Sequence, residues 1–348
     1  MTLLWAGFLL GCAFGIAARL GRFCLLRGLR QWAIATAREN GGAPALQAFA
    51  LALAVALLAS QALAWAGLVD LGQAQVVRAS FSLPGVLLGG LLFGCGMALA
   101  RNCGARALVL LAGGNLRALV ALLCLGLAAQ ATLTGVLAPV RQWLQGWGTT
   151  ALEHATLAQQ LQVAGLSPLA ALALAAGLPA LLLLAYALWR PALRQSAVQL
   201  WAAIAVGALV AAGWWVTAHV GVDPFEPTPI TSLSFIGPVA EGLLFLQLAV
   251  GRDASVGPAI VAGTLAGAFA AALLTRSLRW EGFEQPGRLA ASALGGLLMG
   301  LGGVLAVGCS IGQGLSGLST LAISSLPAAI GIAGGALLTL RLQAAFQR

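Results

Sequence analysis

The sequence predicts an all-α polytopic membrane protein. Of its 348 residues, 60% are hydrophobic and only 8% are charged, whereas a soluble globular chain carries about 25% charged residues. Apolar runs of 18 or more residues recur along the chain, and a helix needs about 20 such residues to cross the hydrocarbon core of a bilayer. We therefore expect a single integral membrane domain over residues 1–348, with the lipid bilayer as its surroundings, and exclude soluble, disordered and collagen-like folds.

Glycine, proline and arginine residues divide the apolar sequence into about 13 segments that we expect to be helical. Some are too short to span a bilayer, and short, broken helices at membrane depth are tolerated where they are buried in protein or line a cavity. We therefore expect re-entrant hairpins at 103–113 and 309–322. No basic leader precedes the first 18 residues, so they are interpreted as a retained helix. The segments are 3–18, 23–37, 45–69, 84–100, 103–113, 115–138, 167–189, 199–219, 233–250, 255–275, 288–306, 309–322 and 325–346.

All 18 basic residues are arginine, and the net charge is +9. No basic stretch alternates with aromatic residues on a polar face, so nucleic acid is not expected as a partner. Most of the arginines fit loop anchoring and the positive-inside bias. Arg190, Arg194, Arg341 and Arg348 predict a multi-pass protein of the cell's inner (plasma) membrane with its C-terminus in the cytoplasm.

An internal repeat is the most informative feature of the chain. Nine of fifteen positions are identical between GGLLFGCGMALARNC at 89–103 and GGLLMGLGGVLAVGC at 295–309. The paired glycines in each copy allow close helix packing, but packing does not explain a cysteine at the same place in both. Repeated halves with broken helices at matching positions point to a central transport site. We therefore expect a transport domain with half-repeats over about 1–140 and about 200–348.

Three of the six cysteines lie at helix breaks: Cys24, Cys103 and Cys309 each follow a break and precede another apolar segment. The chain has no C-x-x-C motif and only two histidines, so zinc-finger, thioredoxin-like and haem-attachment patterns are absent. We expect no metal and no cofactor. The remaining cysteines lie inside apolar runs, where cysteine is commonly a packing residue: Cys12, Cys95 and Cys124.

The breaks have the chemistry of an anion site. A helix that starts just after a break directs free N–H groups and the positive end of its dipole at whatever occupies the break. A thiol there is soft and polarizable, so we expect it to favour a reduced-sulfur or selenium anion over a hard anion. Arginines add positive charge and glycines allow close approach of the backbone: Arg22, Arg101, Arg106, Gly104 and Gly312.

Three segments resemble the signature segments of the YeeE/YedE family of sulfur-transport membrane proteins, whose characterised members take up thiosulfate. They are GRFC (21–24), GGLLFGCGMALARNCGARAL (89–108) and GGLLMGLGGVLAVGCSIGQGLSGLSTLA (295–322), and the resemblance covers nearly the whole chain. It implies an hourglass-like fold of about nine spanning helices and about four short re-entrant helices. It also implies a small TusA-like cytoplasmic sulfur-carrier protein as a partner.

The resemblance places the family's functional cysteines on Cys24, Cys103 and Cys309, where they would relay thiosulfate through S–H contacts to its sulfur. One departure concerns the central cysteine. The family often has Ala-Gly-Gly-Cys there, and this chain has Ala-Arg-Asn-Cys at 100–103. We expect the larger side chains at 101 and 102, and the charge of the arginine, to narrow the transport pore or to alter its selectivity.

The leading hypothesis is an inner-membrane transporter, not an enzyme, that takes up thiosulfate or a related reduced-sulfur anion. One alternative is a membrane-embedded enzyme for sulfur transfer or thiol exchange, which would need a resolving cysteine near a nucleophile. Another is a selenium-compound transporter on the same scaffold. No G-x-x-x-x-G-K-[S/T] motif is present, so energy must come from the membrane potential, from a gradient or from consumption of the substrate by a partner.

Overall fold

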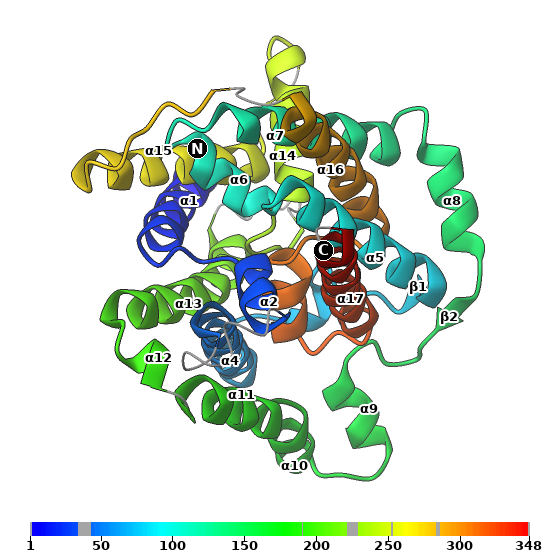
Figure 1. The fold of residues 1–348 in the computed structure, drawn as a ribbon. Coiled ribbons are helices and arrows are strands. Elements are labelled where there is room, and N and C mark those ends of the chain that lie inside the picture. Colours follow the sequence, from blue (N-terminus) through cyan, green and yellow to red (C-terminus); the bar gives the residue numbers. More distant parts are fainter. Residues whose placement is uncertain are drawn as a thin grey trace.

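The protein is an almost wholly helical bundle in a computed structural model (Figure 1). Among the described residues, the one sheet pairs β1 (Ser80–Ser82) with β2 (Thr149–Ala151) in antiparallel register. Nine of the described helical segments are long and apolar enough to cross a membrane. The predicted all-α polytopic membrane fold is therefore confirmed. The structure describes residues 2–33, 43–189, 191–220, 229–251, 253–282 and 286–346.

The helices follow the predicted apolar segments closely. The end of the predicted segment 23–37, residues 34–37, lies outside the described residues, as do Arg190 and Arg348. The bounds are α1 Thr2–Leu20, α2 Leu25–Ala33, α4 Pro44–Trp65, η1 Leu71–Gln73, α5 Leu83–Ala100, α6 Gly104–Leu111, α7 Leu116–Leu133, α8 Ala138–Gly146, α9 Leu157–Val163, α10 Pro168–Leu172, the π-helix η2 Ala173–Gly177, α11 Leu178–Trp189, α12 Pro191–Arg194, α13 Ala197–His219, α14 Ile236–Gln247, α15 Val256–Leu274, α16 Pro286–Leu305, the π-helix η3 Gly312–Gly317 and α17 Ser325–Phe346.

Short helices occupy the two segments for which re-entrant hairpins are predicted. Helix α6 fills 103–113 and η3 lies within 309–322, and each follows a break after a long helix. All six residues of η3 are buried, as are most residues of α6. In the breaks themselves, Asn102, Cys103 and residues 308–311 are buried, whereas Arg101 is exposed. Protein therefore encloses most of the non-helical backbone, which is the condition for irregular structure at membrane depth.

Polar caps determine where helices begin after loops. At the start of α5, the N–H of Gly85 donates to Ser82 Oγ over 3.0 Å. At the start of α7, the N–H of Ala118 donates to Asn115 Oδ1 over 3.1 Å. Each cap gives a partner to an N–H group that the helix itself leaves unpaired and contributes about 1 kcal/mol.

Glycines bring the central helices into close contact. Gly94 of α5 faces the Ile332 carbonyl of α17, and Gly300 of α16 faces the Leu125 carbonyl of α7; at either position an added Cβ would overlap backbone atoms. Both glycines belong to the G-x-x-x-G pairs of the internal repeat. Helix association in a bilayer relies on such small residues, because lipid supplies no hydrophobic force between helices. Packing therefore accounts for these glycines.

The helix pairings recur in matching form. Helix α1 packs along α15 as α13 packs along α4, and α5 packs along α17 as α16 packs along α7. The pairs α1–α13 and α5–α16 are also in contact. The same contacts therefore result when each helix is exchanged with its counterpart: α1 with α13, α4 with α15, α5 with α16, and α7 with α17. Figure 1 shows α8, α9 and α10 at the periphery.

Replacing Gly94 by alanine is expected to lower the free energy of unfolding by about 1–3 kcal/mol, the cost of overpacking a close contact. The added methyl group would meet backbone atoms of α17, which no side-chain rotation relieves. Gly242→Ala in α14 is the matched control, because a Cβ there meets nothing within 4 Å. The thermal unfolding midpoint of each purified variant measures the effect. Equal midpoints for the two variants would contradict this account of the packing.

Candidate functional site: a cysteine path beside an arginine pocket

The three cysteine breaks share one backbone feature: two residues before each cysteine, a residue other than glycine adopts the left-handed conformation. These residues are Arg22 (φ 48°), Arg101 (φ 58°) and Val307 (φ 60°). A left-handed residue ends a helix by turning the chain so that the next N–H groups pair with carbonyls of the last turn. After Arg22, the N–H of Phe23 donates to the Ala18 carbonyl over 3.0 Å. At each break, the chain therefore turns sharply at the left-handed residue, and this turn sets the direction of the segment that follows.

Each cysteine then lies at the start of the next helical segment. Cys24 directly precedes α2, and Cys103 is the N-cap residue of α6. The N–H of Gly312 donates to Cys309 Sγ over 3.3 Å. The third residue after Cys24 and after Cys103 likewise directs its N–H toward the sulfur. All three sulfurs thus lie where first-turn N–H groups have no partner within the helix.

The three thiols form a series through the centre of the protein. Their residues are nearly enclosed, with exposed fractions of 8% for Cys24, 3% for Cys103 and 1% for Cys309. The thiols of Cys24 and Cys103 lie close enough to interact electrostatically. Cys103 also contacts the side chain of Ser310, the residue next to Cys309. The structure therefore brings together three cysteines that are far apart in the sequence.

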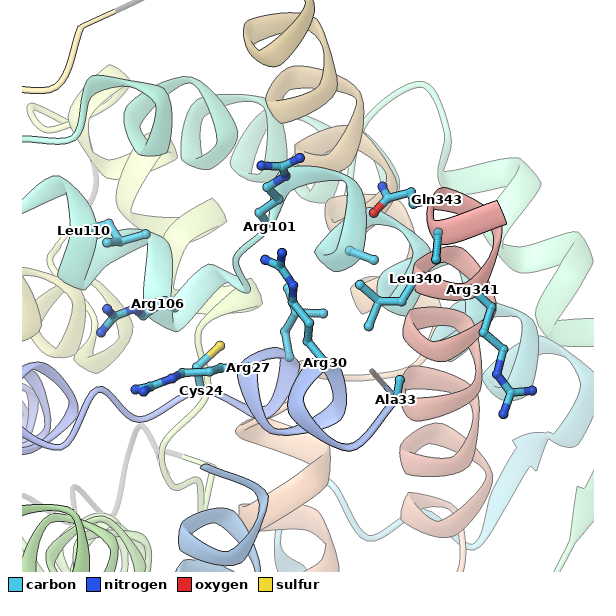
Figure 2. A pocket seen from close by; sticks show the side chains of 13 residues that line it. Cys24, Arg27, Arg30, Ala33, Arg101, Arg106, Leu110, Leu340, Arg341 and Gln343 are labelled. Atoms are coloured by element: carbon cyan, nitrogen blue, oxygen red, sulfur yellow. The ribbon is translucent and has the colours of Figure 1, made fainter. Parts of the chain in front are cut away.

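An arginine-lined pocket of about 400 Å³ opens beside Cys24 (Figure 2). Its lining contains residues of α2, α5, α6 and α17 and the break between α5 and α6, and none of the described lining residues is acidic. Cys24 is the one cysteine in the lining, so the pocket meets the series of thiols at that residue. Five arginines contribute to the wall: Arg27, Arg30, Arg101, Arg106 and Arg341.

The pocket contains two of the three arginines predicted as site residues. Arg101 and Arg106 line it, whereas Arg22 does not; Arg22 is exposed, and its charge acts on Arg27. Sequence reasoning missed Arg27 and Arg30 as site residues, although their spacing of three places them on one face of a helix. It also missed Arg341 as a site residue, which only the packing of α17 against α2 brings to the pocket.

Polar residues surround the far end of the series, at Cys309. Ser310 Oγ and Gln313 Oε1 are buried and have no hydrogen-bond partner among the described residues. At Gly312, a Cβ would lie 2.7 Å from Ser234 Oγ and 3.7 Å from Cys309 Sγ. The absence of a side chain at Gly312 therefore keeps space beside the Cys309 thiol. Sequence reasoning missed the polar residues of this region, although a cluster of serine and glutamine within an apolar segment is a signal that could have indicated them.

Gly104 has a different environment from Gly312. A Cβ at Gly104 would lie 3.2 Å from Leu125 Cδ1, so its missing side chain would point at α7. Gly104 is buried and is the first residue of α6, so its backbone adjoins Cys103. We therefore assign any role of Gly104 to its backbone N–H group.

The other three cysteines contact neighbouring helices. Cys95 Sγ lies 3.6 Å from the Gly335 carbonyl of α17. The Cβ of Cys124 and the backbone of Cys12 lie against glycines of α16 and α15. Each is partly exposed rather than buried, and none lines the arginine pocket. These contacts are those of packing residues.

The charge of the arginine pocket is not balanced by acidic side chains. Among the described residues, one ion pair is present, between Arg117 and Glu281 over 3.4 Å, and neither residue lines the pocket. Within the pocket, Arg106 Nη1 donates to the Ala18 carbonyl over 3.5 Å. An arginine at the bilayer centre costs on the order of 3 kcal/mol on insertion scales, so an anion in the pocket would be a stabilising counter-charge.

Nine membrane-spanning candidates among the described residues, broken helices and a buried series of thiols beside a cationic pocket are typical of a multi-pass membrane transporter for an anion. The kind of transporter follows from comparison with known families. Residues 20–338 match the family described as Sulphur transport. The chain belongs to this family, which confirms the resemblance noted in the sequence.

Two relatives align with nearly the full length of the chain. A protein of Spirochaeta thermophila named Thiosulfate transporter TsuA is 28% identical to it, over 94% of this chain and 95% of that protein. A protein of Escherichia coli K12 with the same name is 25% identical, over 90% of this chain and 87% of that protein. These relatives and the family establish sulfur-anion transport at a membrane as the general function.

The contact between Cys24 and Cys103 predicts that an oxidising catalyst such as copper–phenanthroline links these two residues in the purified protein. Mass spectrometry of digested protein would detect the linked peptides. Cys24→Ala should abolish the link, whereas Cys95→Ala should leave it unchanged, because Cys95 contacts α17 and not this pair. Formation of links mainly between other cysteines would show that the thiols are not arranged as described.

Proposed function

We propose that this protein takes up thiosulfate or a related reduced-sulfur anion through the inner membrane and passes it along the thiols of Cys24, Cys103 and Cys309. The observation that carries the proposal is the series of three buried thiols that meets an arginine pocket. The printed name of both relatives, Thiosulfate transporter TsuA, supports the choice of substrate.

The two kinds of side chain have separate tasks in this proposal. Guanidinium groups attract an anion by charge and pair with its oxygens. Thiols are weak hydrogen-bond donors, and a soft sulfur atom of the substrate suits them better than a hard oxygen. Arg101 and Arg106 hold the anion near Cys24 and Cys103, and Arg22 adds its charge beside Arg27.

Beyond Cys103, the anion would move into the polar region around Cys309. Ser310 lies beside Cys103, and its buried hydroxyl makes no hydrogen bond to the described residues, so this hydroxyl is placed to donate to the substrate. The N–H of Gly312 directs positive charge at the same place. When the anion moves from one thiol to the next, it exchanges one set of weak contacts for another. It can therefore pass through without binding tightly at any step.

A second candidate function is a membrane-embedded enzyme for sulfur transfer or thiol exchange. The contact between Cys24 and Cys103 favours it, because a resolving thiol beside a nucleophilic one is what such exchange needs. Thiosulfate with different isotopes on its two sulfurs would separate the candidates. A transporter delivers both labels together, whereas an enzyme separates them.

Competition by selenium oxyanions would test the third candidate, a selenium-compound transporter.

We also propose that the chain consists of two half-repeats, about 1–140 and about 200–348. The matching helix pairs support this division, as does the equivalent position of Arg101 and Val307 before the two repeated cysteines.

A small TusA-like sulfur carrier in the cytoplasm would remove the delivered sulfur and so provide the driving force.

Cys103→Ala is expected to abolish uptake, because the central thiol contacts Cys24 on one side and Ser310 on the other. The measurement is growth on thiosulfate as sole sulfur source, in a host that lacks other uptake systems. Cys95→Ala is the matched control and should support normal growth. Membrane levels of both variants must equal that of the unchanged protein. Normal growth with Cys103→Ala would refute the role of this thiol.

The proposed orientation places the C-terminus in the cytoplasm and the N-terminus outside. Nine spans, an odd number, require the two ends to lie on opposite sides, and Arg194 and Arg341 favour the cytoplasm for the C-terminal side. Reporter fusions at each terminus measure the orientation. A reporter that works only in the periplasm should be active at the N-terminus and silent at the C-terminus; the reverse pattern would overturn the orientation.

A further inference from the structure

The arginine pocket has more positive charge than the transport of one anion along thiols requires. Five arginines and, among the described residues, no acidic residue share about 400 Å³. Three of the five, Arg27, Arg30 and Arg341, do not belong to the cysteine breaks. A water molecule in the liquid occupies about 30 Å³, so the pocket has room for an oxyanion that keeps part of its hydration shell.

Two of the five guanidinium groups lie close together (Figure 2). Those of Arg27 and Arg106 lie together on one side of Cys24, and the charges of these two residues interact directly. Arg30 points toward Arg101, whose own guanidinium group points away from Cys24, and Arg341 points away from both. Like charges held this close favour a shared anion, because planar guanidinium groups bind the oxygens of sulfate- and phosphate-type ions in bidentate fashion.

These groups recognise charge and oxygen geometry but not softness. We propose that the arginine pocket is a binding site for hard tetrahedral dianions, the class of inorganic sulfate and hydrogen phosphate, with Arg27 and Arg106 as its principal ligands. Such an anion has no soft sulfur to offer the thiols, so it is held in the pocket and not passed on. It blocks the step between the pocket and Cys24 and thereby inhibits transport from the side to which the pocket opens.

Sulfate binding to the full-length purified protein, measured by titration calorimetry at constant ionic strength with chloride as the balancing ion, tests the site. We expect saturable binding. Arg27→Gln and Arg106→Gln should each weaken it at least about tenfold, the effect of losing one charge-assisted partner. Arg117→Gln is the matched control and should leave it unchanged, since Arg117 lies outside the pocket and pairs with Glu281. Absence of saturable binding, or equal losses in all three variants, would overturn the proposal.

The inhibition rests on the proposed transport function, and proteoliposomes distinguish the failure of one from the failure of the other. Sulfate on one side of the membrane should slow thiosulfate transport, and sulfate on the other side should not. Arg27→Gln should reduce this inhibition. If calorimetry shows the site but no thiosulfate is transported, the proposed function fails and the anion site stands. If thiosulfate is transported and sulfate inhibits from neither side, the inhibitory role of the pocket is wrong.

Discussion

Backbone polar groups inside a bilayer have no water to bind, and this constraint governs every break in the protein. A helix that ends at membrane depth must pair its last carbonyls, and the helix that follows must expose its first N–H groups to something polar. Here left-handed residues close the ends of the long helices. The thiols that come next receive the free N–H groups of the following segment. The same geometry that makes a break tolerable also places a sulfur at the start of a helix, where an anion is favoured.

Charge and softness are sensed in different places as a result. The arginines gather where α2, α6 and the end of α17 meet, and this region is open enough for charged side chains to keep some contact with solvent. The thiols lie deeper, where each residue is at most 8% exposed and a guanidinium would be costly to bury. Under the proposed function, a substrate must therefore satisfy two requirements in series: negative charge at the pocket, and an atom soft enough to leave the arginines for a thiol. An ion that meets only the first requirement stays at the entrance.

The sequence predicts the fold and the breaks well because both depend on local patterns. Apolar length predicts the spans, and glycine and arginine punctuation predicts short helices at 103–113 and 309–322. The internal repeat and the position of the cysteines identify the three thiols. What the sequence does not reveal is which charged residues converge. Arg341 is more than 300 residues from Arg30, and only the packing of α17 beside α2 makes them neighbours. Their proximity depends on tertiary packing, and no local sequence pattern indicates it.

The residue before Asn102 shows how strain and function meet in this site. A left-handed conformation is free of cost for glycine, whereas a residue with a side chain holds it at a cost of about 1 kcal/mol or more. The family often has glycine at this position, and here Arg101 adopts the left-handed conformation with φ 58°. The break thus keeps its backbone geometry while gaining a guanidinium group in the wall of the pocket. Val307 holds the same left-handed conformation at the equivalent break without lining the pocket, so what distinguishes Arg101 is the positive charge that its side chain adds to the pocket wall.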